Sequence, residues 1–224
     1  MFATRTRATV LFNSFLHGVL LYSILFYLPL YFESSIEHRP FTAAIDVFPI
    51  CFTVMPFAIL VAFAIEYLRK YRWSVWSAWT FTIAGFGVIS LLRSSSNAHQ
   101  RTGFQILAGA GLGTLYPALT IPMQASVPED DVGLAMGMFV FARQTGDVVG
   151  VAVGFTVFSN VFASQIKILY PLAPSLLSLE NASEAIDFIP KLRDLVVDPV
   201  LKTGILRLYA ESIRWIWVSM IVLS

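Results

Sequence analysis

Charged residues are scarce in this chain, and their scarcity excludes a water-soluble protein. Only 13% of the 224 residues are Asp, Glu, Lys or Arg, whereas 57% are hydrophobic, and the mean hydropathy is +0.72. A soluble domain of this size needs a charged surface that such a composition cannot supply. The composition therefore predicts an all-α integral membrane protein that crosses the bilayer several times.

Cysteine and histidine are also rare. The single Cys51 excludes an internal disulfide, and the three histidines, His17, His38 and His99, do not have the spacing of a metal site. The net charge of +1 gives no reason to expect a nucleic acid as partner. No nucleophile–base pair is evident in the sequence, so an intramembrane enzyme ranks third among the functions considered, and we expect no cofactor.

Long apolar segments, by contrast, fill most of the chain. A hydrocarbon core about 30 Å thick is crossed by roughly 20 helical residues. The predicted spans are 9–32, 41–65, 73–92, 103–125 and 133–162, followed by a sixth that begins at 211 and is incomplete at 224. Pro49 and Pro56 predict kinks in the second span. The first span ends in Tyr27, Tyr31 and Phe32, which suit an aromatic belt at the membrane interface.

Residues 163–210 are predicted to form an extracytoplasmic connection. Within it, Ala182–Val197 has the helical spacing of an amphipathic helix that lies on the membrane or covers the outer mouth of the bundle. Asp198 and Pro199 are a good N-cap and first-turn pair for the last helix. Asn181-Ala182-Ser183 is a glycosylation sequon, and we expect it on the outer side.

Basic residues give the predicted orientation. Arg5 and Arg7 precede the first span, and a basic loop of Arg69, Lys70 and Arg72 follows the second, so that both groups lie on one side of the membrane. Loops rich in Lys and Arg face the cytoplasm. The N-terminus is therefore predicted to be cytoplasmic.

The fifth span holds two charges near its middle, and we expect the other helices to be organised around it. Arg143 lies about 15 Å of helix beyond Gly133, close to mid-membrane. A cation there costs about 2.5–3.5 kcal/mol or more, unless it faces a partner or water inside the bundle. Asp147 follows one turn later on the same face. The pair has two interpretations. It lines a central cavity, where it binds substrate or couples to helix movement, or it forms an internal ion pair that holds helices together.

Other polar residues in the spans have two interpretations each. Asn13 and His17 are four residues apart and share a face, where they bind substrate, relay a proton, or hydrogen-bond a neighbouring helix. Gln124 lies near the cytoplasmic end of the fourth span, where it belongs to the substrate pathway or is solvated at the interface.

Small residues and prolines predict close helix packing. Gly109 and Gly113 form a G-x-x-x-G face for helix contact. They do not form a dinucleotide loop, because the local spacing is G-x-G-x-G and no soluble strand precedes it. Pro117, Gly146 and Gly150 are further candidates for packing or gating positions.

Three stretches resemble the C-terminal half of a fungal major facilitator transporter, and most of all the fourteen-span drug:proton antiporters. They are FLHGVLLYSILFYLPLYFE, LAGAGLGTLYP and QASVPEDDVGLAMGMFVFARQTGDVVGVAVGFTVFSN. The most specific parts are Gln124–Pro128 and Phe141–Gly150. The resemblance implies the C-terminal six-helix half of a major facilitator fold with its last helix truncated. It also implies export of small hydrophobic compounds in exchange for protons by alternating access.

The resemblance has one local departure. Related transporters tend to have glycines before the basic loop after the second span, whereas this chain reads AFAIEYLRKYRW and contains Glu66. A whole transporter of this kind is about twice as long, and its substrate site forms between two halves, so we expect this chain alone not to transport. The alternative function is a non-transporting membrane protein that binds partner helices. The plasma membrane is favoured over the vacuolar membrane.

Overall fold

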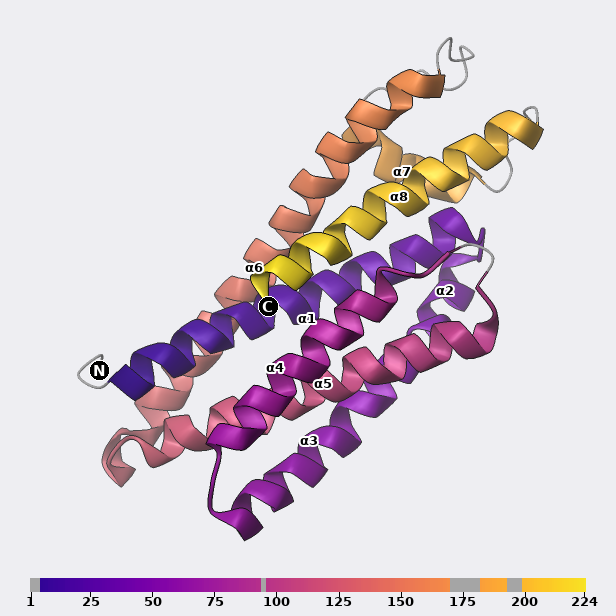
Figure 1. Cartoon of the computed structure of the whole chain (residues 1–224). Helices are drawn as coiled ribbons and strands as arrows, with labels where there is room; N and C mark the ends of the chain where they lie inside the picture. Colours follow the sequence, from indigo (N-terminus) through magenta and orange to yellow (C-terminus); the bar gives the residue numbers. More distant parts are fainter. Residues whose placement is uncertain (1–4, 94–95, 170–181, 193–198) are drawn as a thin grey trace.

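All regular structure in the described part of the chain is helical. The computed structural model describes residues 5–93, 96–169, 182–192 and 199–224 (Figure 1). Its helices are α1 (Arg5–Ser35), α2 (Pro40–Asp46), α3 (Phe48–Leu68), α4 (Arg72–Ile89), α5 (Ala98–Ala125), α6 (Val132–Gln165), α7 (Ala182–Leu192) and α8 (Pro199–Leu223), with short 3-10 turns η1 (Glu129–Asp131) and η2 (Ile166–Leu169). The predicted all-α membrane fold is confirmed.

Four helical segments among the described residues are long and apolar enough to cross a membrane. They are Arg5–Ser35, Pro40–Leu68, Ala98–Ala125 and Glu129–Gln165. The predicted spans 73–92 and 211–224 fall on α4 and α8, which are not among these four segments. The 18 residues of α4 include Arg72 and three tryptophans, and α8 carries Lys202, Arg207, Glu211 and Arg214. The predicted segment 211–224 is the second half of α8, a helix of 25 residues that begins at Pro199.

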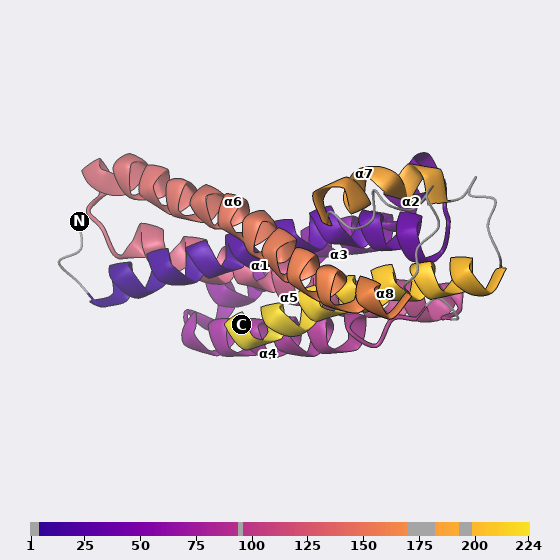
Figure 2. The ribbon, with the colours of Figure 1, turned by 90° about the horizontal axis from the view of Figure 1, so that it is seen from above.

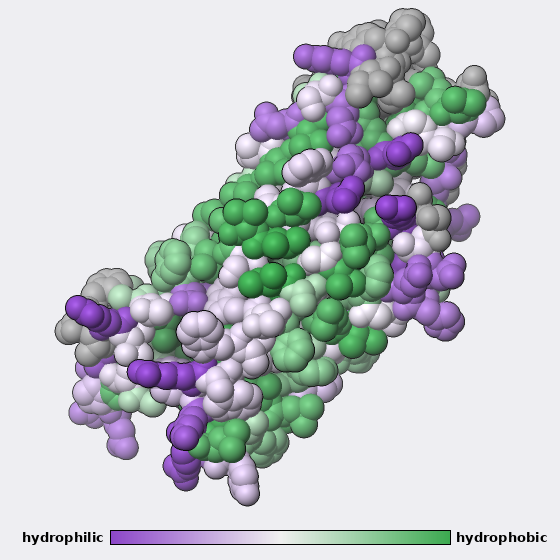
Figure 3. All heavy atoms as spheres, in the orientation of Figure 1, coloured by the Kyte–Doolittle hydropathy of each residue, from purple (hydrophilic) through white to green (hydrophobic). Residues whose placement is uncertain are grey.

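The long helices run alongside one another (Figures 1 and 2). Helix α1 packs along α6, α5 packs along both α3 and α4, and α8 lies against α1, α4 and α6. On the face shown in Figure 3, hydrophilic side chains gather toward the two ends of the molecule, and apolar side chains cover much of the length between them. This distribution suits a bundle whose middle lies in hydrocarbon.

Glycines allow α1 and α6 to touch backbone to backbone. Gly146 faces the carbonyl oxygen of Phe15, and Gly150 faces the carbonyl oxygen of Val19, so closely that a Cβ on either glycine would overlap the α1 backbone. Close approach through small residues is a principal source of helix association in membranes, where lipid offers no hydrophobic driving force. The contact fixes the face of α6 that α1 covers.

Two more glycines bring α5 against α3. Gly109 faces the carbonyl oxygen of Ile50, and Gly113 faces that of Val54, again with no room for a Cβ. The G-x-x-x-G face of α5 is therefore turned toward α3 in this structure.

The second predicted span is divided into two helices. Pro49 lacks the N–H that would bond to the carbonyl of Ile45, so α2 ends at Asp46 and α3 begins at Phe48. Pro56 lies inside α3 without interrupting it.

The expected aromatic belt at the end of α1 is wrong. Tyr27, Tyr31 and Phe32 are almost completely buried among the helices rather than exposed at an interface. The hydroxyl of Tyr27 donates a hydrogen bond of 2.7 Å to the carbonyl of Val151 on α6. Because α1 is surrounded by α2, α5, α6, α7 and α8, aromatic side chains fill its contacts with its neighbours.

The predicted amphipathic helix is α7, and its apolar stripe faces the bundle. Ala185, Phe188 and Ile189 are buried against the other helices. The hydroxyl of Tyr209 on α8 donates a 2.5 Å hydrogen bond to the carbonyl of Ala185. Residues 193–197 of the predicted helix, and the sequon residue Asn181, lie outside the described residues.

Candidate functional site

The predicted basic side is a single end of the bundle. The guanidinium of Arg7 donates two hydrogen bonds, of 2.9 and 2.5 Å, to the carbonyl of Ser126, and so joins the start of α1 to the end of α5. Arg69 and Lys70 line a groove with Ala125, the last residue of α5. The basic groups at the N-terminus and after α3 therefore lie at the same end.

Arg143 of α6 faces an aromatic ring of the neighbouring helix α5. Its guanidinium carbon lies 4.9 Å from the ring centre of Tyr116 on α5, within the distance at which an aromatic face attracts a cation. Its Nε is buried without a hydrogen-bond partner. Among the described residues, Arg143 has no carboxylate within 4.0 Å, so it forms no ion pair with Asp147.

Asp147 is buried at the contact between α6 and α1. Its side chain is only 7% exposed, and Oδ1 has no hydrogen-bond partner. A Cβ added to Gly18 would lie 2.8 Å from Oδ1. The absence of a side chain at Gly18 leaves space beside the carboxylate.

His17 lies on α1 next to Gly18 and is 1% exposed. Its Nε2 is 3.2 Å from the carbonyl oxygen of Leu112 on α5. A carbonyl only accepts, so this contact assigns the proton to Nε2 and leaves Nδ1 with a free lone pair. Nδ1 is buried without a partner, and the imidazole meets the Tyr116 ring edge-on, with 6.5 Å between ring centres.

Three helices therefore contribute to one central polar cluster, which we define as His17, Tyr116, Arg143 and Asp147. The guanidinium donates hydrogen bonds, whereas the carboxylate and Nδ1 of the imidazole accept hydrogen bonds or protons. Tyr116 is 43% exposed and presents an aromatic surface beside the charge. Among the described residues, no three His, Cys, Asp or Glu side chains come together as metal ligands would.

The sequence is similar to those of fungal proteins named as transporters and efflux pumps. The chain is 35% identical to the efflux pump FUS6 of Gibberella fujikuroi over 97% of its length. It is 33% identical to the MFS-type transporter sphD of Aspergillus fumigatus and 30% identical to the MFS transporter L2 of Phoma sp., in each case over its whole length. The chain belongs to the major facilitator superfamily.

The alignments cover 37–39% of these relatives, so this major facilitator chain spans about two fifths of their length. No family model matches the sequence. The relatives are transporters and efflux pumps rather than enzymes. With the apolar helices, they identify an integral membrane protein of the same superfamily.

The other candidate residues of the major facilitator chain lie apart from the central polar cluster or serve helix contacts. Asn13 accepts a hydrogen bond of 2.9 Å from the indole of Trp79 on α4 and donates one of 2.7 Å to the carbonyl of Thr9. Gln124 is exposed at the end of α5, and Pro117 is buried in α5 directly after Tyr116. Only His17, Arg143 and Asp147 of the predicted pathway residues are brought together.

Tyr116 is not among the site residues predicted from the sequence. A signal for it was present, because a half-buried arginine in an apolar bundle requires a partner. With no carboxylate near Arg143 on a neighbouring helix, an aromatic ring is the alternative partner. Tyr116 stands in the glycine-rich run LAGAGLGTLYP, where the small residues let α5 approach its neighbours.

Proposed function

We propose that this chain forms one half of a secondary active transporter that exports small hydrophobic compounds in exchange for protons. The proposal is carried by the buried, unpartnered atoms of the central polar cluster, namely His17 Nδ1, Arg143 Nε and Asp147 Oδ1. Leaving a buried polar atom without a partner costs about 1–3 kcal/mol. Three such atoms together in an apolar bundle suit a site that binds a proton, water or substrate during transport.

The members of the cluster would have different roles. Asp147 would take up and release the proton, because its buried carboxylate lacks a hydrogen-bond partner and burial disfavours its charge. Nδ1 of His17 would accept a hydrogen bond instead, since a second positive charge beside Arg143 is unfavourable. Arg143 would bind the polar part of the substrate or respond to the charge of Asp147. The substrate would lie between this half and a second half, and alternate exposure to the two sides would follow from rocking of the halves.

An efflux assay in sealed vesicles tests this function. The chain alone is compared with the chain joined to the remaining transmembrane segments of the Gibberella fujikuroi efflux pump. The joined protein is expected to export a fluorescent hydrophobic dye when a proton gradient is imposed, and a protonophore should abolish export. Export that is indifferent to the protonophore would refute proton coupling.

Substitutions in the joined protein test the site. Arg143→Ala is expected to abolish export while the protein still reaches the membrane. Gln144→Ala is the matched control, because Gln144 is the next residue of α6 and is exposed. Unchanged export by Arg143→Ala would remove the guanidinium from the mechanism.

A second candidate function, binding of partner helices without transport, is favoured by α3. Most of its large apolar side chains are exposed, including Phe52, Met55, Leu60 and Phe63. If this function is correct, the purified chain forms a stable complex with itself or another helix bundle, and the joined protein exports nothing.

Fluorescence microscopy of the tagged chain would test the favoured location in the plasma membrane against the vacuolar membrane.

A further inference from the structure

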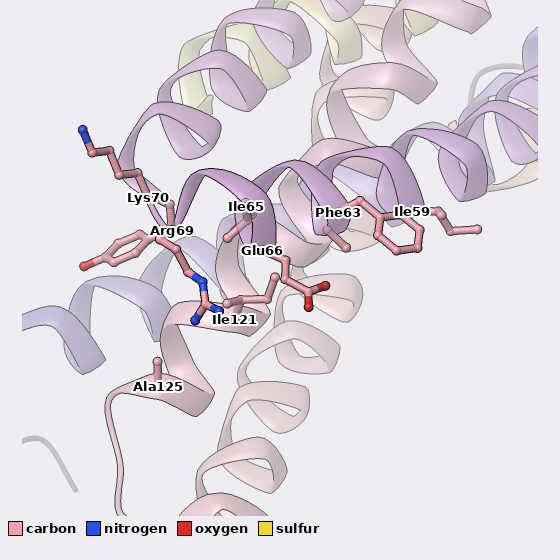
Figure 4. A pocket seen from close by; sticks show the side chains of 10 residues that line it. Ile59, Phe63, Ile65, Glu66, Arg69, Lys70, Ile121 and Ala125 are labelled. Carbon is pink, nitrogen blue, oxygen red and sulfur yellow. The ribbon is translucent and has the colours of Figure 1, made fainter.

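A groove of about 600 Å³ runs between α3 and α5 at the basic end of the bundle. Its walls are apolar and include Ile59 and Phe63 of α3 and Ile121 of α5, as Figure 4 shows. Its volume falls within the range of roughly 300–1,000 Å³ that is usual for ligand sites. The central polar cluster contributes no side chain to it.

One end of the groove carries opposite charges. Figure 4 shows the side chain of Arg69 extending from the end of α3 toward Ile121 and Ala125, with the carboxylate of Glu66 one turn earlier on α3. Lys70 points away from α5 in the same view. Among the described ion pairs neither Glu66 nor Arg69 takes part, so both charges are available to a ligand.

The backbone at Arg69 directs its side chain toward α5. Arg69 caps α3 in the left-handed conformation, with φ of 51°, and its N–H donates to the carbonyl of Ile65 at 2.9 Å. Residues other than glycine rarely adopt this conformation. The turn sends the side chains of Arg69 and Lys70 in different directions, and the guanidinium of Arg69 extends toward α5.

We propose that the groove binds a phospholipid whose headgroup carries a phosphate and a primary ammonium. An acyl chain lies along Ile59, Phe63 and Ile121, the guanidinium of Arg69 donates to the phosphate, and the carboxylate of Glu66 accepts from the ammonium. Guanidinium–phosphate contacts of this kind are among the stronger hydrogen bonds in proteins.

The orientation of the groove matches that of a lipid in a bilayer. The charged end lies where α3 stops, and the apolar walls extend from there toward the middle of the helix. The end of a helix that spans the bilayer lies near the lipid headgroups. Ile59 and Phe63 are 54% and 66% exposed, so this part of α3 is open to an acyl chain. Basic residues at such a position attract lipid phosphates.

The pair of opposite charges favours one headgroup over others. Phosphatidylglycerol has no cation and leaves Glu66 facing a phosphate. Phosphatidylcholine has a trimethylated nitrogen that cannot donate a hydrogen bond. Phosphatidylethanolamine satisfies both Glu66 and Arg69, because its ammonium donates and its phosphate accepts.

Native mass spectrometry of the purified full chain tests the proposal. The chain in detergent is mixed in turn with the palmitoyl-oleoyl forms of phosphatidylethanolamine, phosphatidylcholine and phosphatidylglycerol. We expect one molecule of phosphatidylethanolamine to be retained per chain, about tenfold more tightly than either other lipid, which is the difference expected for one charge-assisted hydrogen bond.

Variants assign the contact to its residues. Arg69→Ala is expected to weaken binding of phosphatidylethanolamine about tenfold, and Glu66→Gln to remove the preference over phosphatidylcholine. Arg72→Ala is the matched control, because Arg72 is exposed in the same basic loop and does not line the groove, and it should bind as the unaltered chain does. Arg69→Gly serves as a second test, because glycine accepts the left-handed conformation and the helix end should fold at least as well.

Three results would overturn the proposal. They are equal retention of the three lipids, undiminished binding by Arg69→Gly, and loss of binding when the remaining transmembrane segments of a relative are joined to the chain. The last result would show that protein, not lipid, covers the groove. None of these measurements depends on transport, so they test the lipid site independently of the proposed function.

Discussion

The guanidinium carbon of Arg143 lies 4.9 Å from the ring centre of Tyr116, so that the cation of α6 faces an aromatic ring of α5 rather than the carboxylate of Asp147 one turn away. An aromatic face attracts a cation without neutralising it. The charge of Arg143 therefore remains available to another group, and the contact joins α5 to α6.

Replacing Tyr116 by Leu should lower the stability of the bundle by about 0.5–2 kcal/mol, because the cation–π contact is lost. Thermal unfolding in detergent measures the change. Tyr116→Phe keeps the ring and should be nearly neutral. In the Arg143→Gln background, the Tyr116→Leu effect should shrink, and an effect of full size there would show that the ring does not act through the guanidinium.

A methyl group at Gly146 should separate α1 from α6, because it would overlap the carbonyl of Phe15. We expect Gly146→Ala to destabilise the bundle by about 1–3 kcal/mol. Gly137→Ala is the control on the same helix, since nothing lies within 4 Å of the added carbon. It should instead stabilise by about 0.5–1 kcal/mol, the usual helix advantage of alanine. Equal effects of the two substitutions would contradict the close contact.

Loss of the Arg7 guanidinium should free the turn between α5 and α6. Arg7→Ala removes both hydrogen bonds to the carbonyl of Ser126, and we expect backbone amides of residues 126–131 to exchange faster with solvent. The expected cost is about 1.5 kcal/mol, at the low end for a charged donor, because Arg7 is only partly buried. Arg5→Ala is the comparison, as Arg5 is exposed. Unaltered exchange in Arg7→Ala would show that the turn is held by other contacts.

The orientation predicted from the basic residues can be checked at the sequon. When the chain is expressed in a fungal cell, Asn181 should be glycosylated, and digestion with an endoglycosidase should increase electrophoretic mobility. Asn181→Gln should run at the digested position without treatment. A chain that lacks the modification and whose N-terminal tag is accessible from outside the cell would reverse the orientation.

The sequence predicted the positions of the helices well, because an apolar segment long enough to span a bilayer must satisfy its backbone hydrogen bonds internally as a helix. The helix that starts at Pro199 was expected from its cap. A helix over Ala182–Val197 was expected from its spacing, and α7 covers Ala182–Leu192 of it. The break before α3 follows from Pro49, which cannot donate to Ile45.

The partners of each helix face could not be predicted in the same way. Helices such as α1 and α5 are apolar on all sides, so periodicity does not distinguish a face that packs on protein from one that meets lipid. Tyr27 was therefore expected at the membrane interface and is instead bonded to Val151. Tyr116 was missed for the same reason, since its position opposite Arg143 depends on the rotation of α5 relative to α6.

Helix α3 packs mainly against α5, a helix that the ribosome makes later, after α4. During synthesis α3 is therefore inserted before α5, its principal neighbour among the described residues. Its sequence suits a helix that is inserted before its neighbour, because the stretch FPICFTVMPFAILVAFAI contains no ionisable side chain other than Cys51. Assembly of this part of the molecule is thus a late docking step between helices that are already inserted, and a pause in translation before residue 98 would leave α3 without its principal neighbour.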